Sequence, residues 1–284
     1  MSDALMSEAI ARWIQLAALG LIVGAAVAPW FDRGIAVTAS RHLTRQAGAV
    51  ALFALLVRLL AASRGFVSPG NLLSVTDVLA TLDSAWGRGW IVQVCSVLAA
   101  LLVTFEVTTS RISVRERLVA FAACVAAPLT GHAMSYPAGV SVGAAVTSLH
   151  VLGACTWLGS LAALLLLRST GLATALRRLM PIAFLGVGAL ALSGMATSWG
   201  TLGGLPLPAR LLASGYGRTL ALKLMLVVGV LATGLWQLRA MHLARSEHST
   251  GGAMRRRAWL EVSLGVLVLA ITAVLSLMAP PGHG

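Results

Sequence analysis

Charged residues are scarce in this chain. Of its 284 residues, 11% are Asp, Glu, Lys or Arg, whereas 58% are hydrophobic. A soluble globular domain usually carries about a quarter charged residues, so the composition argues against a soluble domain. Long apolar runs instead fill most of the length. They predict an all-α, polytopic transmembrane helical bundle that forms a single integral membrane domain over residues 1–284.

Cysteine and nucleotide-binding motifs are equally sparse. The three cysteines (Cys95, Cys124 and Cys155) fall inside apolar runs, which argues against a disulfide framework. The sequence contains no P-loop, no dinucleotide fingerprint, no Cys-x-x-Cys pair and no Asp-Lys-Thr-Gly-type phosphorylation site. No polar segment is long enough to form a catalytic domain. We therefore expect neither an ATP-driven pump nor an enzyme.

The apolar runs predict eight helices, each near or above the ~20 residues needed to cross a bilayer. They cover residues 10–31, 44–64, 88–108, 116–134, 142–167, 178–199, 217–240 and 257–279. Similar landmarks recur in both halves, since Arg45 opens the second predicted helix and Arg178 opens the sixth. This faint repeat suggests two four-helix halves in parallel orientation, residues 10–137 and 138–284.

Basic residues outnumber acidic ones and give the chain a net charge of +12. They gather in short clusters, mostly in the connections after the first, third, fifth and seventh predicted helices. The positive-inside rule then predicts that these connections face the cytoplasm and that both termini face the periplasm of a bacterial inner membrane. Because the predicted membrane orientation accounts for the positive charge, we expect no nucleic-acid partner.

Two histidines lie near the outer ends of adjacent predicted helices. Counting about 1.5 Å per residue from the cytoplasmic ends places His132, His150 and Met195 in one layer, roughly 24–27 Å up, with Met134 just above it. A histidine inside an apolar helix is costly and usually faces an interior cavity. His132 and His150, together with the soft ligands Met134 and Met195, therefore predict a transition-metal site. Alternatively, the two histidines ligate haem b from opposite sides.

Other residues near this layer have both functional and structural interpretations. Trp157 follows His150 by seven residues and so shares its helix face, where it either walls the site or only packs. Cys95 and Cys155 are interpreted first as small packing residues and second as metal ligands. His283, in the C-terminal tail, is a candidate for capturing metal on the outer side.

Charged residues inside the spans need partners. Arg58 is too deep for easy snorkelling, and we expect it to pair with Asp77 or Asp83 on the outer side or to border an ion path. Lys223 can snorkel outward, although it reaches the same layer as the histidines. Glu261 lies near the predicted inner surface, where we expect it to pair with neighbouring arginines.

Four elements follow one another between residues 145 and 280. They are His150 with Trp157-Leu158-Gly159; Arg177-Arg178-Leu179 leading to Ser193-Gly194-Met195; Ser214-Gly215-Tyr216-Gly217-Arg218 with Leu222-Lys223-Leu224; and Arg255 to Glu261 with Leu275 to Pro280. In this order they resemble the copper resistance protein D (CopD/PcoD) family. The Tyr-Gly…Lys element is the most specific of the four, while Gly131-His132-Ala133 fits more loosely.

The resemblance implies a non-enzymatic protein of copper homeostasis and resistance in the bacterial inner membrane, which transports copper ions from periplasm to cytoplasm. It implies His132 and His150 as copper ligands, with Met134 and Met195 as softer helpers. Besides copper ions and membrane lipid, it implies a separate periplasmic CopC-type copper-binding protein as a partner. The oligomeric state is left open. The alternative function is a membrane b-type cytochrome with haem between His132 and His150.

Overall fold

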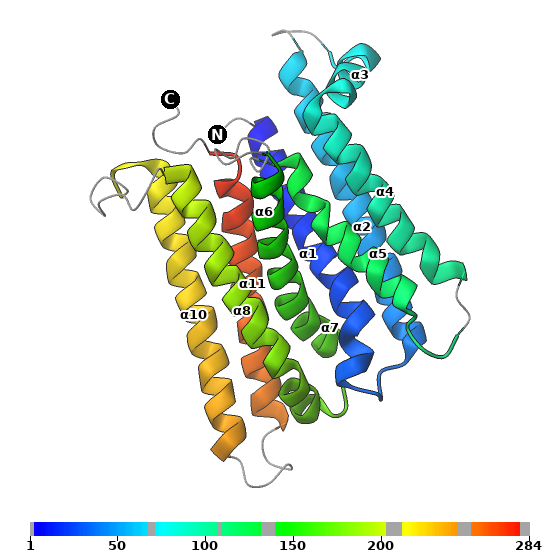
Figure 1. Ribbon diagram of the computed structural model, residues 1–284, viewed down its shortest axis with the longest axis vertical. Coiled ribbons are helices and arrows are strands. Elements are labelled where there is room, and N and C mark those ends of the chain that lie inside the picture. Colours follow the sequence, from blue (N-terminus) through cyan, green and yellow to red (C-terminus); the bar gives the residue numbers. More distant parts are fainter. Residues whose placement is uncertain are drawn as a thin grey trace.

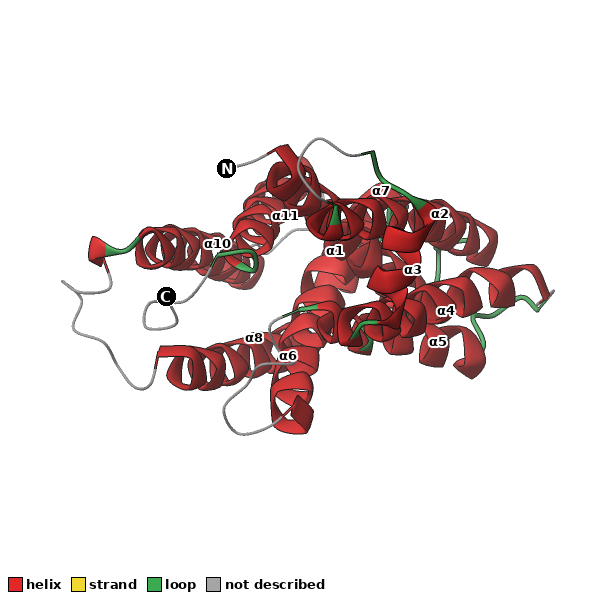
Figure 2. Cartoon of the chain, turned by 90° about the horizontal axis from the view of Figure 1, so that it is seen from above, coloured by secondary structure: helices red, strands yellow, loops and turns green. Residues whose placement is uncertain are grey.

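The computed structural model describes residues 3–67, 72–106, 109–131, 140–202, 212–243 and 251–278. These residues form helices joined by short connections and contain no strand, which confirms the predicted all-α bundle (Figure 2). The helices are α1 (Asp3–Phe31), α2 (Val37–Ser63), η1 (Arg64–Phe66), α3 (Val75–Asp83), α4 (Ala85–Glu106), α5 (Val114–Val125), η2 (Ala127–Thr130), α6 (Val140–Ala154), η4 (Cys155–Gly159), α7 (Ser160–Leu166), α8 (Leu172–Leu202), α10 (Gly215–Leu243) and α11 (Gly251–Leu275).

Seven helical segments of the described chain are long and apolar enough to cross a membrane. They are Leu5–Phe31, Val37–Ser63, Ala85–Glu106, Val142–Leu166, Leu172–Trp199, Gly215–Ala240 and Gly252–Leu275. The chain is thus a multi-pass membrane protein. The helix predicted at 116–134 corresponds to the 12-residue α5 followed by the 3-10 turn η2. A 3-10 turn at Ala127–Thr130, with Pro128 near its start, interrupts the helix that the apolar run predicted.

The helices run alternately up and down the bundle (Figure 1). As a result, α1 begins and α11 ends at the same end of the molecule, and the α1–α2 and α7–α8 connections lie at the other end. The shorter α5, continued by η2, also runs along the bundle beside the seven long segments, so the chain passes through it an even number of times (Figure 1). The orientation of the bundle relative to the two sides of a membrane stays a prediction.

Helix α1 is the central element of the fold. It contacts α2, α5, η4, α7, α8 and α11, and its Leu19 and Ile22 are fully buried. Small residues bring its backbone close to η4: a Cβ added to Gly24 would overlap the carbonyl of Gly159, and one added to Gly159 would overlap the carbonyl of Gly20. Close approach through glycine is a common way to pack membrane helices.

Buried apolar side chains form two clusters that share α1. One cluster combines α1 with α2, α4, α5 and the buried Cys155; the other combines α1 with α7, α8 and α11. Helix α10 contributes to neither cluster. It packs mainly against α11, and only 6% of its most apolar 18-residue window is buried. The bundle is therefore tightly packed around α1 and loosely packed at α10.

Candidate functional site

His150 lies on the face of α6 that packs against α8. Its Nδ1 is 3.0 Å from Ser193 Oγ, and a Cβ added to Gly194 would lie 3.6 Å from its ring. The Ser193 hydroxyl donates to the carbonyl of Ala189 at 2.5 Å. Because that bond uses the hydroxyl proton, Ser193 Oγ accepts the bond from the histidine, which assigns the proton to Nδ1. The other ring nitrogen, Nε2, is then the one that can ligate a metal.

The backbone changes form directly after His150. Residues Cys155–Gly159 form a π-helical turn between α6 and α7, and Trp157 lies in this turn. Such turns widen a helix and are frequent at functional sites. Here the turn also carries Gly159, where η4 meets the backbone of α1. The π-helical turn thus connects the segment of α6 that carries His150 to the close backbone contact between η4 and α1.

Only part of the predicted ligand set can be placed. His132, Met134 and His283 lie outside the described residues, so their positions remain predictions. Met195 is on α8 close to Ser193, but its side chain is 62% exposed. The described residues contain no group of three or more His, Cys, Asp or Glu side chains placed to hold a metal ion. The structure therefore brings Ser193, rather than Met195, to His150.

Lys223 of α10 is the charged residue that interacts with His150 electrostatically. It is half-buried, and it comes from the Tyr-Gly…Lys element of the sequence. A cation at Nε2 of His150 would therefore experience the repulsion of a neighbouring ammonium group. Sequence reasoning placed Lys223 in the same layer as His150, and the structure shows that α10 brings it into electrostatic range of the histidine.

The cysteines occupy two different environments. Cys95 is exposed on α4, whereas Cys124 and Cys155 are buried near each other. Cys124 Sγ also lies 3.7 Å from the carbonyl oxygen of Leu19 in α1. Both buried thiols belong to the first apolar cluster, which agrees with their interpretation as packing residues.

Arg58 of α2 is the most completely enclosed charge in the described chain, at 1% exposure. Its Nη1 donates to Gln15 Oε1 at 2.8 Å and to Thr130 Oγ1 at 2.9 Å, and its Nη2 donates to the Thr130 carbonyl at 3.2 Å. The Glu8 carboxylate lies 3.8 Å from Nη2. We call Glu8, Gln15, Arg58 and Thr130 the arginine cluster.

The predicted pairing of Arg58 with Asp77 or Asp83 is wrong. Asp77 instead forms a capping box with Ser74 at the start of α3, and the backbone carbonyl of Asp83 accepts a hydrogen bond from Arg88. Thr130, the main partner of Arg58, comes from the 3-10 turn η2, which the sequence pattern did not predict. The polar residues Glu8 and Gln15 of α1, which lie two turns apart and so share a helix face, were the available signal.

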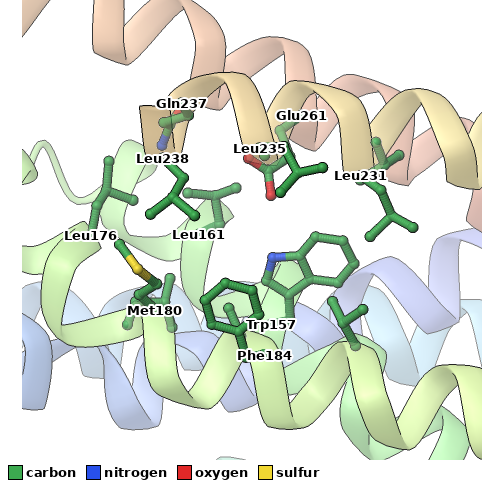
Figure 3. Close-up of a pocket in the computed structure, with 15 residues that line it drawn as sticks. Trp157, Leu161, Leu176, Met180, Phe184, Leu231, Leu235, Gln237, Leu238 and Glu261 are labelled. Carbon is green, nitrogen blue, oxygen red and sulfur yellow. The ribbon is translucent and has the colours of Figure 1, made fainter. Parts of the chain in front are cut away.

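A cavity of about 130 Å³ lies between η4, α7, α8, α10 and α11 (Figure 3). Most of its lining is apolar, but Trp157, Gln237 and Glu261 also line it. The indole of Trp157 faces the Glu261 carboxylate in the cavity (Figure 3). Gln237 Oε1 is buried and has no hydrogen-bond partner among the residues that the structure describes. We call this space the Glu261 cavity.

The predicted pairing of Glu261 with nearby arginines is also wrong. Arg257, one turn earlier on α11, stacks over the Trp236 ring at 4.3 Å, and Arg255 donates to the Leu165 carbonyl at 2.9 Å. Glu261 is only 5% exposed and turns toward the cavity instead. A carboxylate inside an apolar run was the signal for this site, and intramembrane carboxylates are commonly functional.

Comparisons with known proteins agree with the resemblance seen in the sequence. Residues 173–275 match the model of the family described as copper resistance protein D, and this range includes Ser193, Lys223 and Glu261. The copper transport protein CutJ of Bacillus subtilis (strain 168) is 31% identical over 216 residues, which make up 70% of this chain and 38% of that relative. The chain thus spans well under half the length of this relative. No solved structure matches the chain. Residues 173–275 of this chain are thus similar to the copper resistance protein D family.

Proposed function

We propose that this protein handles copper and transports copper ions across the membrane through a site centred on His150. The observation that carries the proposal is the His150–Ser193 pair at the interface of α6 and α8, because it orients an imidazole with Nε2 available as a ligand. The family description and the printed name of the CutJ relative support copper as the ion. Imidazole is a suitable ligand for copper.

The remaining ligands in this proposal come from the segment that precedes α6. His132 and Met134 would complete the site with one nitrogen and one thioether sulfur, and thioethers favour Cu(I). Met195, with its exposed side chain, would act as an accessory ligand at the surface of α8 rather than beside His150. Cu(I) prefers soft ligands, so the site does not need carboxylate groups.

Lys223 gives the site a property that suits transport. An ammonium group in electrostatic range of His150 weakens the binding of a cation there, so bound copper is released more readily. Conduction requires binding that is strong enough for entry and weak enough for exit. Lys223 would therefore set the release rate, and its replacement by a neutral residue would tighten binding.

The direction of transport in this proposal is from periplasm to cytoplasm, across the bacterial inner membrane. It is supported by the charge distribution along the sequence, which assigns the α1–α2 and α7–α8 connections to the cytoplasm. A separate periplasmic CopC-type protein would deliver the copper on the side where α1 begins. Membrane lipid would surround the apolar outer surface of the bundle.

The test is metal analysis of the purified protein together with cellular copper accumulation. His150→Ala should lower the copper bound per chain and change accumulation, whereas His42→Ala, at an exposed position of α2, should change neither. Unchanged copper content and accumulation in His150→Ala would reject His150 as a ligand. The absorbance spectrum of the same sample tests the alternative of haem b, which would give a strong Soret band.

A further inference from the structure

A second pocket, of about 450 Å³, lies at the end of the bundle that carries the α7–α8 connection (Figure 1). It is lined by Leu165 and Leu166 at the end of α7, by Arg168 just after α7, and by Arg255 and Trp259 near the start of α11. Ligand pockets typically measure roughly 300–1,000 Å³, so the volume suits a ligand. Leu166, Arg168 and Trp259 are exposed, so the pocket opens to the surroundings of the bundle. We call it the Arg168 pocket.

The charge of the Arg168 pocket is wholly positive, because its described lining contains two arginines and no carboxylate. Arg255 Nη2 donates to the Leu165 carbonyl at 2.9 Å, which holds this side chain at the end of α7. The other N–H groups of Arg255 and the side chain of Arg168 have no ion-pair partner among the described residues. A guanidinium group carries five N–H donors in a planar fork that matches the oxygens of a phosphate. The pocket therefore offers donors and positive charge to an anion.

The backbone of Arg168 is also unusual. It is the only residue other than glycine with a positive φ in the described chain, at 53°. Its N–H donates to the Leu165 carbonyl at 3.3 Å, and Ser169 N–H donates to the Leu164 carbonyl at 3.0 Å. These two bonds form a Schellman motif, in which glycine normally occupies the left-handed position because a Cβ is unfavourable there. Residues in such strained conformations concentrate at functional sites, so the position favours a role for the arginine side chain.

The Arg168 pocket lies where two membrane-spanning segments meet the membrane surface. Leu166 is the last residue of the segment Val142–Leu166, and Arg255 lies near the start of Gly252–Leu275. Lipid headgroups surround this level of a multi-pass protein. Trp259 is exposed there, and tryptophan is enriched at the headgroup level because its ring is amphipathic. Basic pockets between transmembrane helices bind anionic headgroups, and Leu166 adds an apolar contact for an acyl chain.

We propose that the Arg168 pocket binds the headgroup of an anionic phospholipid, with Arg168 and Arg255 donating to its phosphate. Leu166 and Trp259 contact the part of the lipid nearest the headgroup. A zwitterionic phospholipid fits less well, because its ammonium group would lie beside two arginines and meet no carboxylate in the described lining. The bound lipid would connect the α7–α8 connection to the start of α11. This inference goes beyond copper transport and does not depend on it.

The test measures lipid binding to the full-length protein in detergent by native mass spectrometry, with phosphatidylglycerol and phosphatidylcholine of identical acyl chains. The unaltered protein should bind phosphatidylglycerol more tightly. A basic residue at a membrane surface contributes ~1 kcal/mol, which corresponds to about 5-fold in affinity. Arg168→Gln should therefore weaken phosphatidylglycerol binding about 5-fold, and the double variant with Arg255→Gln about 25-fold. Arg111→Gln, which removes an exposed arginine from the α4–α5 connection, is the matched control and should leave the affinity unchanged.

Arg168→Gly separates lipid binding from stability. It removes the guanidinium group but places the favoured residue at the left-handed position, so it should weaken phosphatidylglycerol binding as Arg168→Gln does without lowering the unfolding temperature. Three results would overturn the proposal. They are equal affinity of the unaltered protein for the two lipids, equal losses in Arg168→Gln and Arg111→Gln, and displacement of phosphatidylglycerol by inorganic phosphate, which would make the pocket a site for free phosphate.

Discussion

The arginine cluster and the Glu261 cavity both place a charged side chain deep in the bundle, yet their surroundings differ. Arg58 is 1% exposed and Glu261 is 5% exposed. The arginine has several acceptors from α1 and η2, whereas the glutamate faces an indole ring and an adjoining cavity (Figure 3). A buried charge with several partners is part of the packed structure, because removing it leaves those partners unsatisfied.

The difference follows from the position of each group relative to α1. The arginine cluster lies where α2 and η2 meet the central helix, so its partners are fixed by a tightly packed core. The Glu261 cavity is bordered by α10, which packs mainly on α11 and is otherwise exposed. The same helix carries Lys223 toward His150, so α10 borders both His150 and the Glu261 cavity.

The largest expected effect comes from disturbing α1, which supports both regions. Gly24→Leu would place a side chain on the backbone of Gly159, so α1 and η4 would have to separate. We expect a loss of stability beyond the ~1–3 kcal/mol typical of overpacking, because backbone cannot move aside as a side chain can. The yield of monodisperse protein and its thermal unfolding in detergent measure this.

A matched control for that change exists on α8. Gly188→Leu adds the same side chain where no atom lies within 4 Å of the new Cβ. It should leave unfolding within ~0.5 kcal/mol of the parent protein, as surface substitutions usually do. If the two leucine variants unfold at the same temperature, the α1–η4 contact does not support the two regions.

The next effect concerns the arginine cluster itself. Arg58→Met keeps much of the side-chain length but leaves Gln15 Oε1 and the Thr130 oxygen without their donor. Breaking a buried charged network from one side costs ~3–5 kcal/mol, so the unfolding temperature should fall clearly. Tryptophan fluorescence during heating reports this. Folded Arg58→Met protein should still bind copper at His150; loss of copper without loss of stability would reverse the assignment of the cluster as structural.

The Glu261 cavity should respond in the opposite way. Glu261→Gln removes a charge that has no ion-pair partner among the described residues and keeps the size of the side chain. Neutral replacement of a buried charge is often harmless or stabilising, so thermal unfolding in detergent should change by less than ~1 kcal/mol. A destabilisation as large as that of Arg58→Met would erase the distinction between the two regions.

The helical architecture could be predicted from the sequence, because long apolar runs have few alternatives in a bilayer. The direction in which each side chain points could not be predicted from the sequence. A membrane helix is apolar on nearly all sides, so periodicity did not reveal that Glu261 turns to a cavity or that Arg58 meets η2. His150 was identified because a histidine is conspicuous in an apolar helix, but its partner Ser193 depends on the rotation of α8 against α6.

The smallest expected effect lies outside both regions, at the α1–α2 connection, where Asp32 accepts hydrogen bonds from Ser169 Oγ at 2.5 Å and Gly34 N at 2.8 Å. Burial opposes ionisation of Asp32, but these bonds, the Gly171 amide and the charge of Arg178 outweigh it and lower the pKa of the carboxyl group. A depressed folded-state pKa stabilises the protein above the ordinary aspartate value, and this stabilisation is lost as the pH falls through the folded pKa. Acid unfolding of Asp32→Asn should therefore lose a small pH-dependent component that the parent protein shows. Identical acid-unfolding curves for the two proteins would mean that the partial exposure of Asp32 cancels its effect on stability. Only fully enclosed charges, such as those of the two regions, would then govern stability.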